Sequence, residues 1–239
     1  MRIFFVLTVV SAAACGPRQA TVRVTIPDLE GVETPVPGLQ VIFLPYDRDS
    51  IVRGLEAKAT SPRPKVRELD SLFREFRAPY LEFMRVAVTT DRLRRKRDSL
   101  TGALGAGAPA DPGVRAIEDS IARLTPAETA ANAALGRTRE RLGPSIDRFR
   151  AEAAKWERET YRSYEETVRS LGGRTFGNPV ADTTDARGWA TMTLTNGSWW
   201  VTARSIDPGD PNGEWYWNLK VIGDTVALNP RTGLHRPRY

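Results

Sequence analysis

The hydrophobic period changes twice along this chain, and this change constrains the fold more than any single motif does. Residues 62–171 repeat apolar side chains at steps of three and four, as α-helices do, whereas the segments before and after them alternate with a period of two, as β-strands do. Neither β segment is long enough to bury a core alone. The sequence therefore predicts an α+β protein, in which one small antiparallel β domain is built from both ends of the chain and interrupted by a long helical insertion.

The helical insertion has two halves, each with its own apolar stripe. Residues 102–112 lie between the halves, and their glycines and Pro109 disfavour a helix. Asp111 or Pro112 can begin the next helix. We therefore expect an antiparallel helical hairpin with its tip near residues 102–112 and a coiled-coil seam between its arms. The stripes are Val66, Leu69, Phe73, Phe76, Tyr80, Phe83 and Ala87 in the first half, and Leu135, Leu142, Phe149 and Trp156 in the second.

Several prolines fall inside the helical period. Thr125 and Pro126 have the pattern of a fresh helix start, with a capping residue followed by proline at the first helical position. Pro79 and the Gly143-Pro144 pair predict kinks, because proline lacks the amide hydrogen that a helix interior needs.

The flanking segments contain six expected strands, and Asn196 and Gly197 predict a tight β-hairpin between two of them. We expect residues 20–46 and 175–229 to form the β domain and residues 230–239 to be a loose polar tail. The insertion then spans residues 47–174 and starts with a short helix capped by Asp47 or Asp49. The expected strands are 21–26, 39–44, 189–194, 198–204, 215–221 and 225–228.

The first fifteen residues have the order of a secretory signal, with a charged start, an apolar stretch and a run of small residues. The end of this segment, Ala12-Ala13-Ala14-Cys15-Gly16, resembles the lipobox of bacterial lipoproteins, although that family usually has Leu where Ala12 stands. The resemblance implies that Cys15 carries lipid, that the lipid attaches the protein to a membrane of the cell envelope, and that Gly16 favours the outer membrane. An ordinary signal peptide with an incidental Cys, or a cytosolic start, is the alternative.

The later β segment contains an ordered set of turn and strand residues. It has a Thr-Asp turn, a Gly before a strand, a Gly at a turn, an aromatic-x-Val pair and an Ala. These are Thr184, Asp185, Gly188, Gly197, Trp199, Val201 and Ala203, and Val36, Gly38 and Val41 form a similar entry to an early strand. The set resembles carboxypeptidase regulatory-like, transthyretin-like β-sandwich domains, an Ig-like layout. The long helical insertion departs from that family. The resemblance implies an accessory, non-catalytic domain and names no ligand.

The residue types that most often carry catalysis are scarce. The chain has one His and one Cys, and His235 has no nucleophile and acid placed beside it in the sequence. The loop with Asp207, Asp210, Asn212 and Glu214 departs from the pattern of Ca²⁺ loops and is better explained as a solvated turn. We therefore expect no enzymatic activity, no metal and no cofactor.

Positive charge gathers in the helical insertion. Residues 62–171 contain 22 Lys and Arg against 17 Asp and Glu, which accounts for most of the net charge of +6. The two signs are interleaved, as on the solvated face of a long helix, and no aromatic residues accompany the densest basic run at residues 92–97. We therefore expect no nucleic-acid partner.

Two groups of residues are candidate contact surfaces. The tryptophans can form a stacking platform for a glycan or peptide, or they can fill the core and pack beneath the helices. In the first helical arm, apolar residues occupy more than one face, so Met84 and Val88 either pack within the chain or bind a partner. The four tryptophans are Trp199, Trp200, Trp215 and Trp217.

The sequence as a whole therefore predicts a non-catalytic, lipid-anchored protein of the cell envelope that acts as an interaction or scaffold module. The alternative function is a β-sandwich module that binds a glycan or peptide through surface tryptophans. An envelope protein or a glycan is the expected partner besides the membrane, and the sequence defines no oligomeric state.

Overall fold

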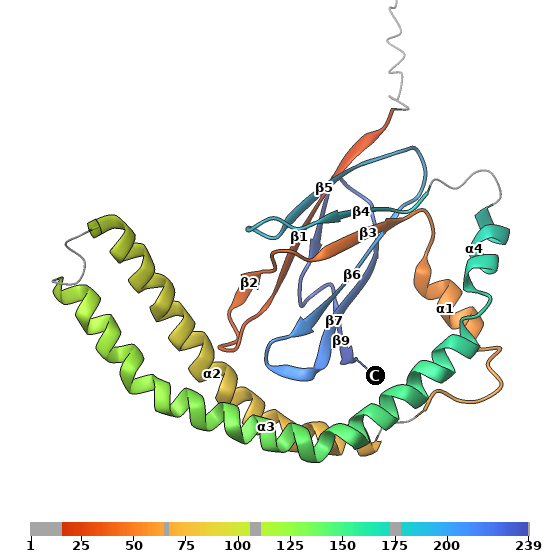
Figure 1. The fold of residues 1–239 in the computed structure, drawn as a ribbon. Helices are drawn as coiled ribbons and strands as arrows, with labels where there is room; N and C mark the ends of the chain where they lie inside the picture. Colours follow the sequence, from red (N-terminus) through yellow and green to blue (C-terminus); the bar gives the residue numbers. More distant parts are fainter. Residues whose placement is uncertain (1–15, 65–66, 106–110, 173–177, 239) are drawn as a thin grey trace, which may run out of the picture.

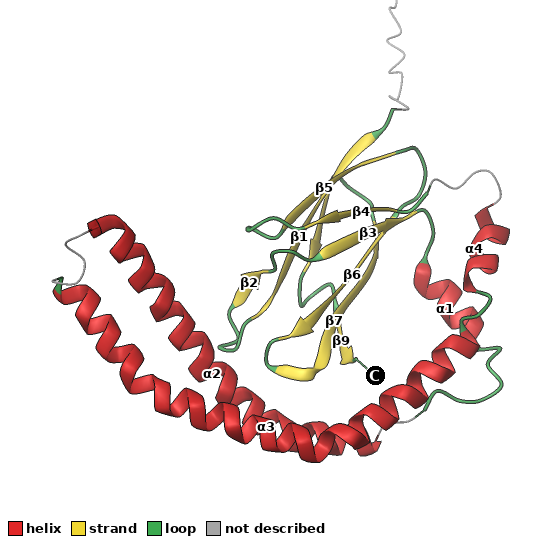
Figure 2. Ribbon diagram, viewed as in Figure 1, coloured by secondary structure: helices red, strands yellow, loops and turns green. Residues whose placement is uncertain are grey.

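The computed structural model describes residues 16–64, 67–105, 111–172 and 178–238. Within these ranges the protein is α+β, as expected, with two β-sheets beside a long, curved pair of helices (Figures 1 and 2). Strands from before and after the helices share each sheet. Residues 1–15, and with them the predicted signal and Cys15, lie outside the described residues.

The first sheet is organised around its longest strand, β1, which pairs with three others. β1 is antiparallel to β2 and β5 but parallel to β8. The expectation of a wholly antiparallel β domain is therefore wrong for this sheet. The chain crosses to this sheet from β7 of the second sheet before it enters β8. The bounds are β1 Arg18–Pro27, β2 Glu33–Pro35, β5 Trp189–Leu194 and β8 Thr225–Leu228.

The second sheet is antiparallel throughout, with the strand order β4-β3-β6-β7-β9. β6 and β7 form its long central hairpin. The bounds are β3 Gln40–Leu44, β4 Val180–Thr183, β6 Trp200–Asp207, β7 Asp210–Lys220 and β9 Leu234–Pro237.

Apolar side chains of both sheets form one core, because alternation along each strand turns one face of each sheet toward the other. Val22 of β1, Phe43 of β3 and Trp217 of β7 are among its fully buried members. Gly188, which leads into β5, has φ +77°, and a Cβ there would lie 2.5 Å from the carbonyl oxygen of Val24. This turn therefore requires glycine, since a side chain would meet the backbone of β1.

Two helices begin where capping residues predict. Asp47 caps α1 (Arg48–Glu56) by accepting hydrogen bonds from the amides of Asp49 and Ser50. Asp111 caps α3 (Pro112–Thr160), whose first residue is proline. α2 (Arg67–Leu104) and α3 lie along each other as two arms, and a short helix, α4 (Tyr164–Gly172), follows. The seam between the arms contains Phe73, Leu142 and Ile146.

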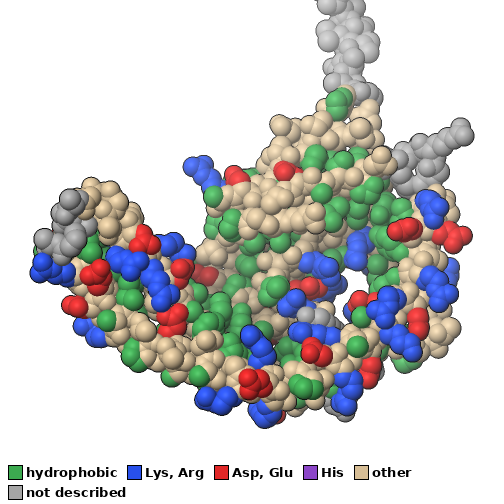
Figure 3. All heavy atoms as spheres, viewed as in Figure 1, with side chains coloured by type: hydrophobic (Ala, Val, Ile, Leu, Met, Phe, Trp, Pro, Cys, Tyr) green, Lys and Arg blue, Asp and Glu red, His purple; other side chains and the backbone are tan. Residues whose placement is uncertain are grey.

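The two arms curve beneath the sheets, and their far halves extend beyond them (Figure 1). Lys, Arg, Asp and Glu alternate over the outer surface of the arms (Figure 3), as expected for a solvated face. α2 contacts β7, and the aromatic side chains Phe76 and Tyr80 line a cleft beside Ile206 and Pro211 of the β6–β7 hairpin. α2 therefore packs in part against the β domain of the same chain.

Three expectations about local structure are wrong. The expected loose tail at residues 230–239 is wrong for its described part, residues 230–238, because β9 pairs with β7 and the ring of His235 contacts Trp215. Asn196 and Gly197 do not close a hairpin, since β5 and β6 belong to different sheets and Trp199 is buried between them. The third is the helix start at Thr125. α3 continues through Pro126 and Pro144, and the Thr125 hydroxyl donates back to the Ile121 carbonyl.

Candidate ligand-binding groove

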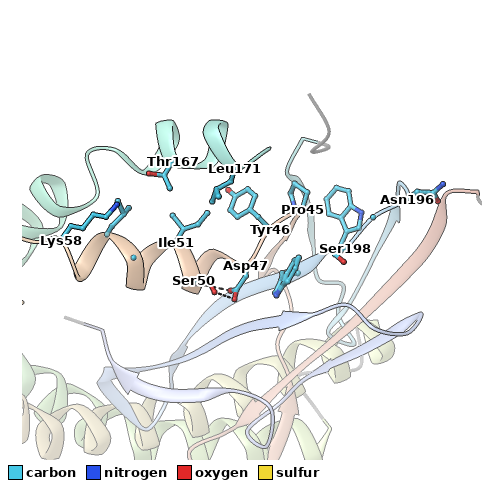
Figure 4. A pocket seen from close by; sticks show the side chains of 15 residues that line it. Pro45, Tyr46, Asp47, Ser50, Ile51, Lys58, Thr167, Leu171, Asn196 and Ser198 are labelled. Carbon is cyan, nitrogen blue, oxygen red and sulfur yellow. Dashed lines mark hydrogen bonds between the residues drawn. The ribbon is translucent and has the colours of Figure 1, made fainter. Parts of the chain in front are cut away.

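An apolar groove of about 560 Å³ lies between α1, α4 and the loop that joins β5 to β6 (Figure 4). Its volume is within the range of about 300–1,000 Å³ that small-molecule sites occupy. It is lined by Pro45, Tyr46, Asp47, Ser50, Ile51, Gly54, Leu55, Lys58, Thr167, Leu171, Asn196, Gly197, Ser198, Trp199 and Trp200.

α1 supplies one wall of the groove. Its apolar residues Ile51 and Leu55 are four apart, so they lie on one helical face, and both are buried. The Asp47 carboxylate at the start of α1 also accepts a hydrogen bond of 2.7 Å from the Asn218 amide in β7. Burial raises the pKa of Asp47, but hydrogen bonds from Ser50, from Asn218 and from backbone amides outweigh it, so the net pKa is lowered. The wall is therefore fixed to the second sheet by an ionised carboxylate.

α4 supplies the facing wall, with Thr167 and Leu171 directed toward α1 (Figure 4). Two tyrosines hold this wall to its surroundings. The Tyr161 hydroxyl donates to the Glu56 carboxylate at 2.5 Å, and the Tyr164 hydroxyl lies 3.4 Å from that of Tyr46. Burial is the main cause that raises the pKa of both tyrosines, followed by these hydrogen bonds. Both hydroxyls therefore stay protonated and keep the walls together at neutral pH.

The β5–β6 loop closes one end of the groove with two adjacent tryptophans. Trp199 is 3% exposed, and its indole N–H donates to the Thr195 carbonyl at 2.8 Å. Trp200 is half-buried, and the ammonium of Lys220 lies 5.6 Å from its ring centroid. The neighbours face different ways, as strand alternation predicts, yet both contribute atoms to the groove.

Charge is distributed unevenly along the groove. Lys58, just past the end of α1, is the only Lys or Arg among the described lining residues, and it lies at the end opposite Asn196 (Figure 4). Lys58 is exposed and forms no salt bridge with any residue in the described ranges. The groove lining is thus mostly apolar, with Lys58 as its cation at one end, and Lys220 lies outside the lining beside Trp200.

The other two candidate tryptophans lie elsewhere. Trp217 is 1% exposed and donates from its indole nitrogen to the Asn229 carbonyl at 3.0 Å, so it is a core residue and its expected role in ligand binding is wrong. Trp215 is half-buried against the His235 ring, with centroids 4.9 Å apart. The four tryptophans therefore do not form one platform.

The partner-binding candidates of the first arm, Met84 and Val88, lie on α2 and do not line the groove. Met84 is half-buried, and Val88 is 37% exposed. Of the two, Val88 leaves more apolar surface open to a partner.

The acidic groups of residues 207–214 are already partnered. Asp207 lies 2.8 Å from the His235 ring, Glu214 accepts a hydrogen bond of 2.9 Å from Arg236, and Asp210 accepts from the Asn212 amide. In the described ranges no three His, Cys, Asp or Glu side chains gather in a way that could hold a metal ion. This loop therefore stabilises its own turn and the pairing of β9.

Sequence reasoning missed the walls of the groove, since α1 and α4 are far apart in the chain. Their apolar residues at helical spacing were the available signal, but nothing in the sequence places the two helices side by side.

Comparisons with known families, with curated proteins and with solved structures found no match. No helix of the described ranges is long and apolar enough to cross a membrane.

Proposed function

We propose that this chain is a non-catalytic, lipid-anchored protein of the cell envelope whose groove binds an apolar ligand. The single observation that supports binding most strongly is the groove itself, because an apolar cavity of 560 Å³ with walls held by hydrogen bonds is a preformed site. The exposed surface of the lining is mostly apolar, which favours an apolar ligand over a sugar. An apolar ligand therefore replaces the glycan as the preferred occupant.

The β part, in this proposal, is a transthyretin-like sandwich near the membrane. β1 begins at the end of the sheets that lies away from the α2–α3 arms (Figure 1). Arg18 pairs with Leu194, the last residue before the β5–β6 loop of the groove. A lipid on Cys15, three residues before Arg18, would keep the groove close to the membrane surface, since three extended residues span about 10 Å. The same attachment directs the helical arms away from the membrane.

The proposal is tested by filling the groove. Gly54 lies on the groove side of α1, and a Cβ there meets no other atom within 4 Å. Gly54→Leu should therefore preserve the fold and occupy the cavity, and leucine also favours a helix more than glycine does. Gly102→Leu, on α2 and equally open, is the matched control.

The measurement is native mass spectrometry of the full chain released from a nonionic detergent in the presence of 1-hexadecanol. We expect one bound hexadecanol in the wild type and in Gly102→Leu, and none in Gly54→Leu. Equal binding by all three proteins would refute an apolar site in this groove.

The helical arms support a second candidate function, docking of an envelope protein. The exposed Val88 and the half-buried Met84 favour it, as does the extension of the arms beyond the sheets (Figure 1). Val88→Glu should leave the helices intact and remove the crosslinks that wild-type protein forms in intact envelopes. If Val88→Glu forms the same crosslinks as the wild type, this part of the arm is not the docking surface.

A further inference from the structure

Three features of the groove point to the class of its ligand. The cavity is elongated, running between α1 and α4 from Lys58 to the Asn196 loop (Figure 4). Its middle is apolar on both sides, with Ile51 and Leu55 on one wall and Leu171 on the other. This shape accepts a chain of methylene groups better than it accepts a compact ring.

The ends of the groove differ in charge. Lys58 places an ammonium at one end, and it has no salt bridge within the described part of the chain. The carboxylate of the lining, Asp47, is occupied by the helix cap and by Asn218, so it does not neutralise Lys58. An anionic group at the Lys58 end would therefore gain an attraction that a neutral group would not.

The number of cations selects among anionic lipids. Lys58 is the only Lys or Arg in the described lining. The nearby Arg53 of α1 lies 3.9 Å from the Asp47 carboxylate, and Lys220 lies outside the lining, with its ammonium 5.6 Å from the Trp200 ring. One ammonium matches the single charge of a carboxylate. A phosphate is usually recognised by several donors, including the fork of an arginine.

We propose that the groove binds a long-chain fatty acid, with its hydrocarbon chain between α1 and α4 and its carboxylate beside Lys58. This inference rests on the proposed function, because it names the ligand class of the same groove. Each further methylene that enters the groove should tighten binding about fourfold, until the cavity is filled. The ion pair at the exposed Lys58 should add up to about fivefold.

The experiment compares palmitate with 1-hexadecanol, which has the same chain length and no charge. Dissociation constants are measured by native mass spectrometry on the full chain in nonionic detergent at pH 8. We expect palmitate to bind more tightly than hexadecanol, by up to about fivefold. Lys58→Ala and Lys58→Gln should abolish that difference, and Lys58→Arg should retain it. Lys96→Ala, an exposed site on α2, should behave as the wild type.

The outcomes separate the two proposals. If hexadecanol binds and Gly54→Leu removes it, but palmitate is no tighter or Lys58→Ala leaves the difference unchanged, the apolar site stands and the fatty acid assignment is overturned. If a lysophosphatidylglycerol binds more tightly than palmitate and this binding depends on Lys58, the fatty acid assignment is also overturned, in favour of a phospholipid. If neither hexadecanol nor palmitate binds, both the proposed function and this inference are refuted.

Discussion

Single residues decide how the two sheets close on each other, and Trp217 is the largest of them. Its side chain is fully buried, and a Cβ on Gly233 would lie 2.5 Å from the indole nitrogen, so the chain before β9 folds tightly over the ring. Trp217→Ala should lower the free energy of unfolding by about 3–5 kcal/mol, because it leaves a cavity and an unpaired carbonyl at Asn229. Urea unfolding followed by far-UV circular dichroism measures this cost. The half-exposed Trp200→Ala is the control and should cost less.

The turn before β5 predicts a pH dependence. The Asp185 carboxylate accepts hydrogen bonds of 2.8 Å from the amides of Trp189 and Arg187. These bonds, led by the one from Trp189, hold the pKa of Asp185 below its ordinary value of 3.8, even though the carboxyl is exposed. The unfolded chain therefore takes up the proton first as the pH falls. The contribution to stability is complete above the unfolded pKa and is lost as the pH falls through the folded one.

Asp185→Asn removes this dependence while keeping an oxygen that can accept the same hydrogen bonds. We expect the urea midpoint of the wild type to exceed that of the variant at pH 6, and the difference to shrink as the pH falls below about 4, the ordinary pKa of an aspartate. A difference that stays constant as the pH falls would show that the carboxylate charge does not contribute.

At the scale of elements, the two helical arms are stabilised by a narrow seam. Leu142 of α3 packs against Phe73 of α2 and is 4% exposed, whereas Val88 faces solvent in part. Leu142→Ala should lower the free energy of unfolding by about 2–5 kcal/mol. The loss should be confined to the arms, because the sheets have a separate core. Hydrogen exchange should therefore accelerate in α2 and α3 and stay unchanged in β1 and β6. Val88→Ala should change neither region.

For the whole molecule, strands from the two ends of the chain are mutually required. β1 joins β5 to β8, and β3 lies between β4 and β6, so residues 175–239 alone lack an internal strand of each sheet. That fragment should aggregate and show no cooperative unfolding. Replacing residues 62–171 with a long glycine-serine linker should instead leave a β protein with a cooperative transition. Dispersed amide signals from the isolated fragment would contradict this dependence on the first strands.

Local chemistry in the sequence is enough to predict the kinds of element and several of their limits. Asp47 and Asp111 predict where helices begin, since a cap needs only its own side chain and the next amides. The alternation of Val22 and Val24 predicts a half-buried strand, and the heptad at Leu135 and Leu142 predicts the seam of the arms. Each of these signals acts between residues that are close in the chain.

Pairing between distant segments was decided only by the tertiary structure. Asn196 and Gly197 have the chemistry of a hairpin turn, yet the burial of Trp199 between the sheets sends the chain across instead. The polar end of the chain becomes β9 because β7 offers it an open edge, and proline is tolerated within α3 because a packed arm can lose one hydrogen bond. The groove follows the same rule. Its walls come from α1, α4 and a loop, and nothing local in the sequence indicates that these three segments meet. The hydrophobic effect can bury apolar residues together however far apart they are in the chain.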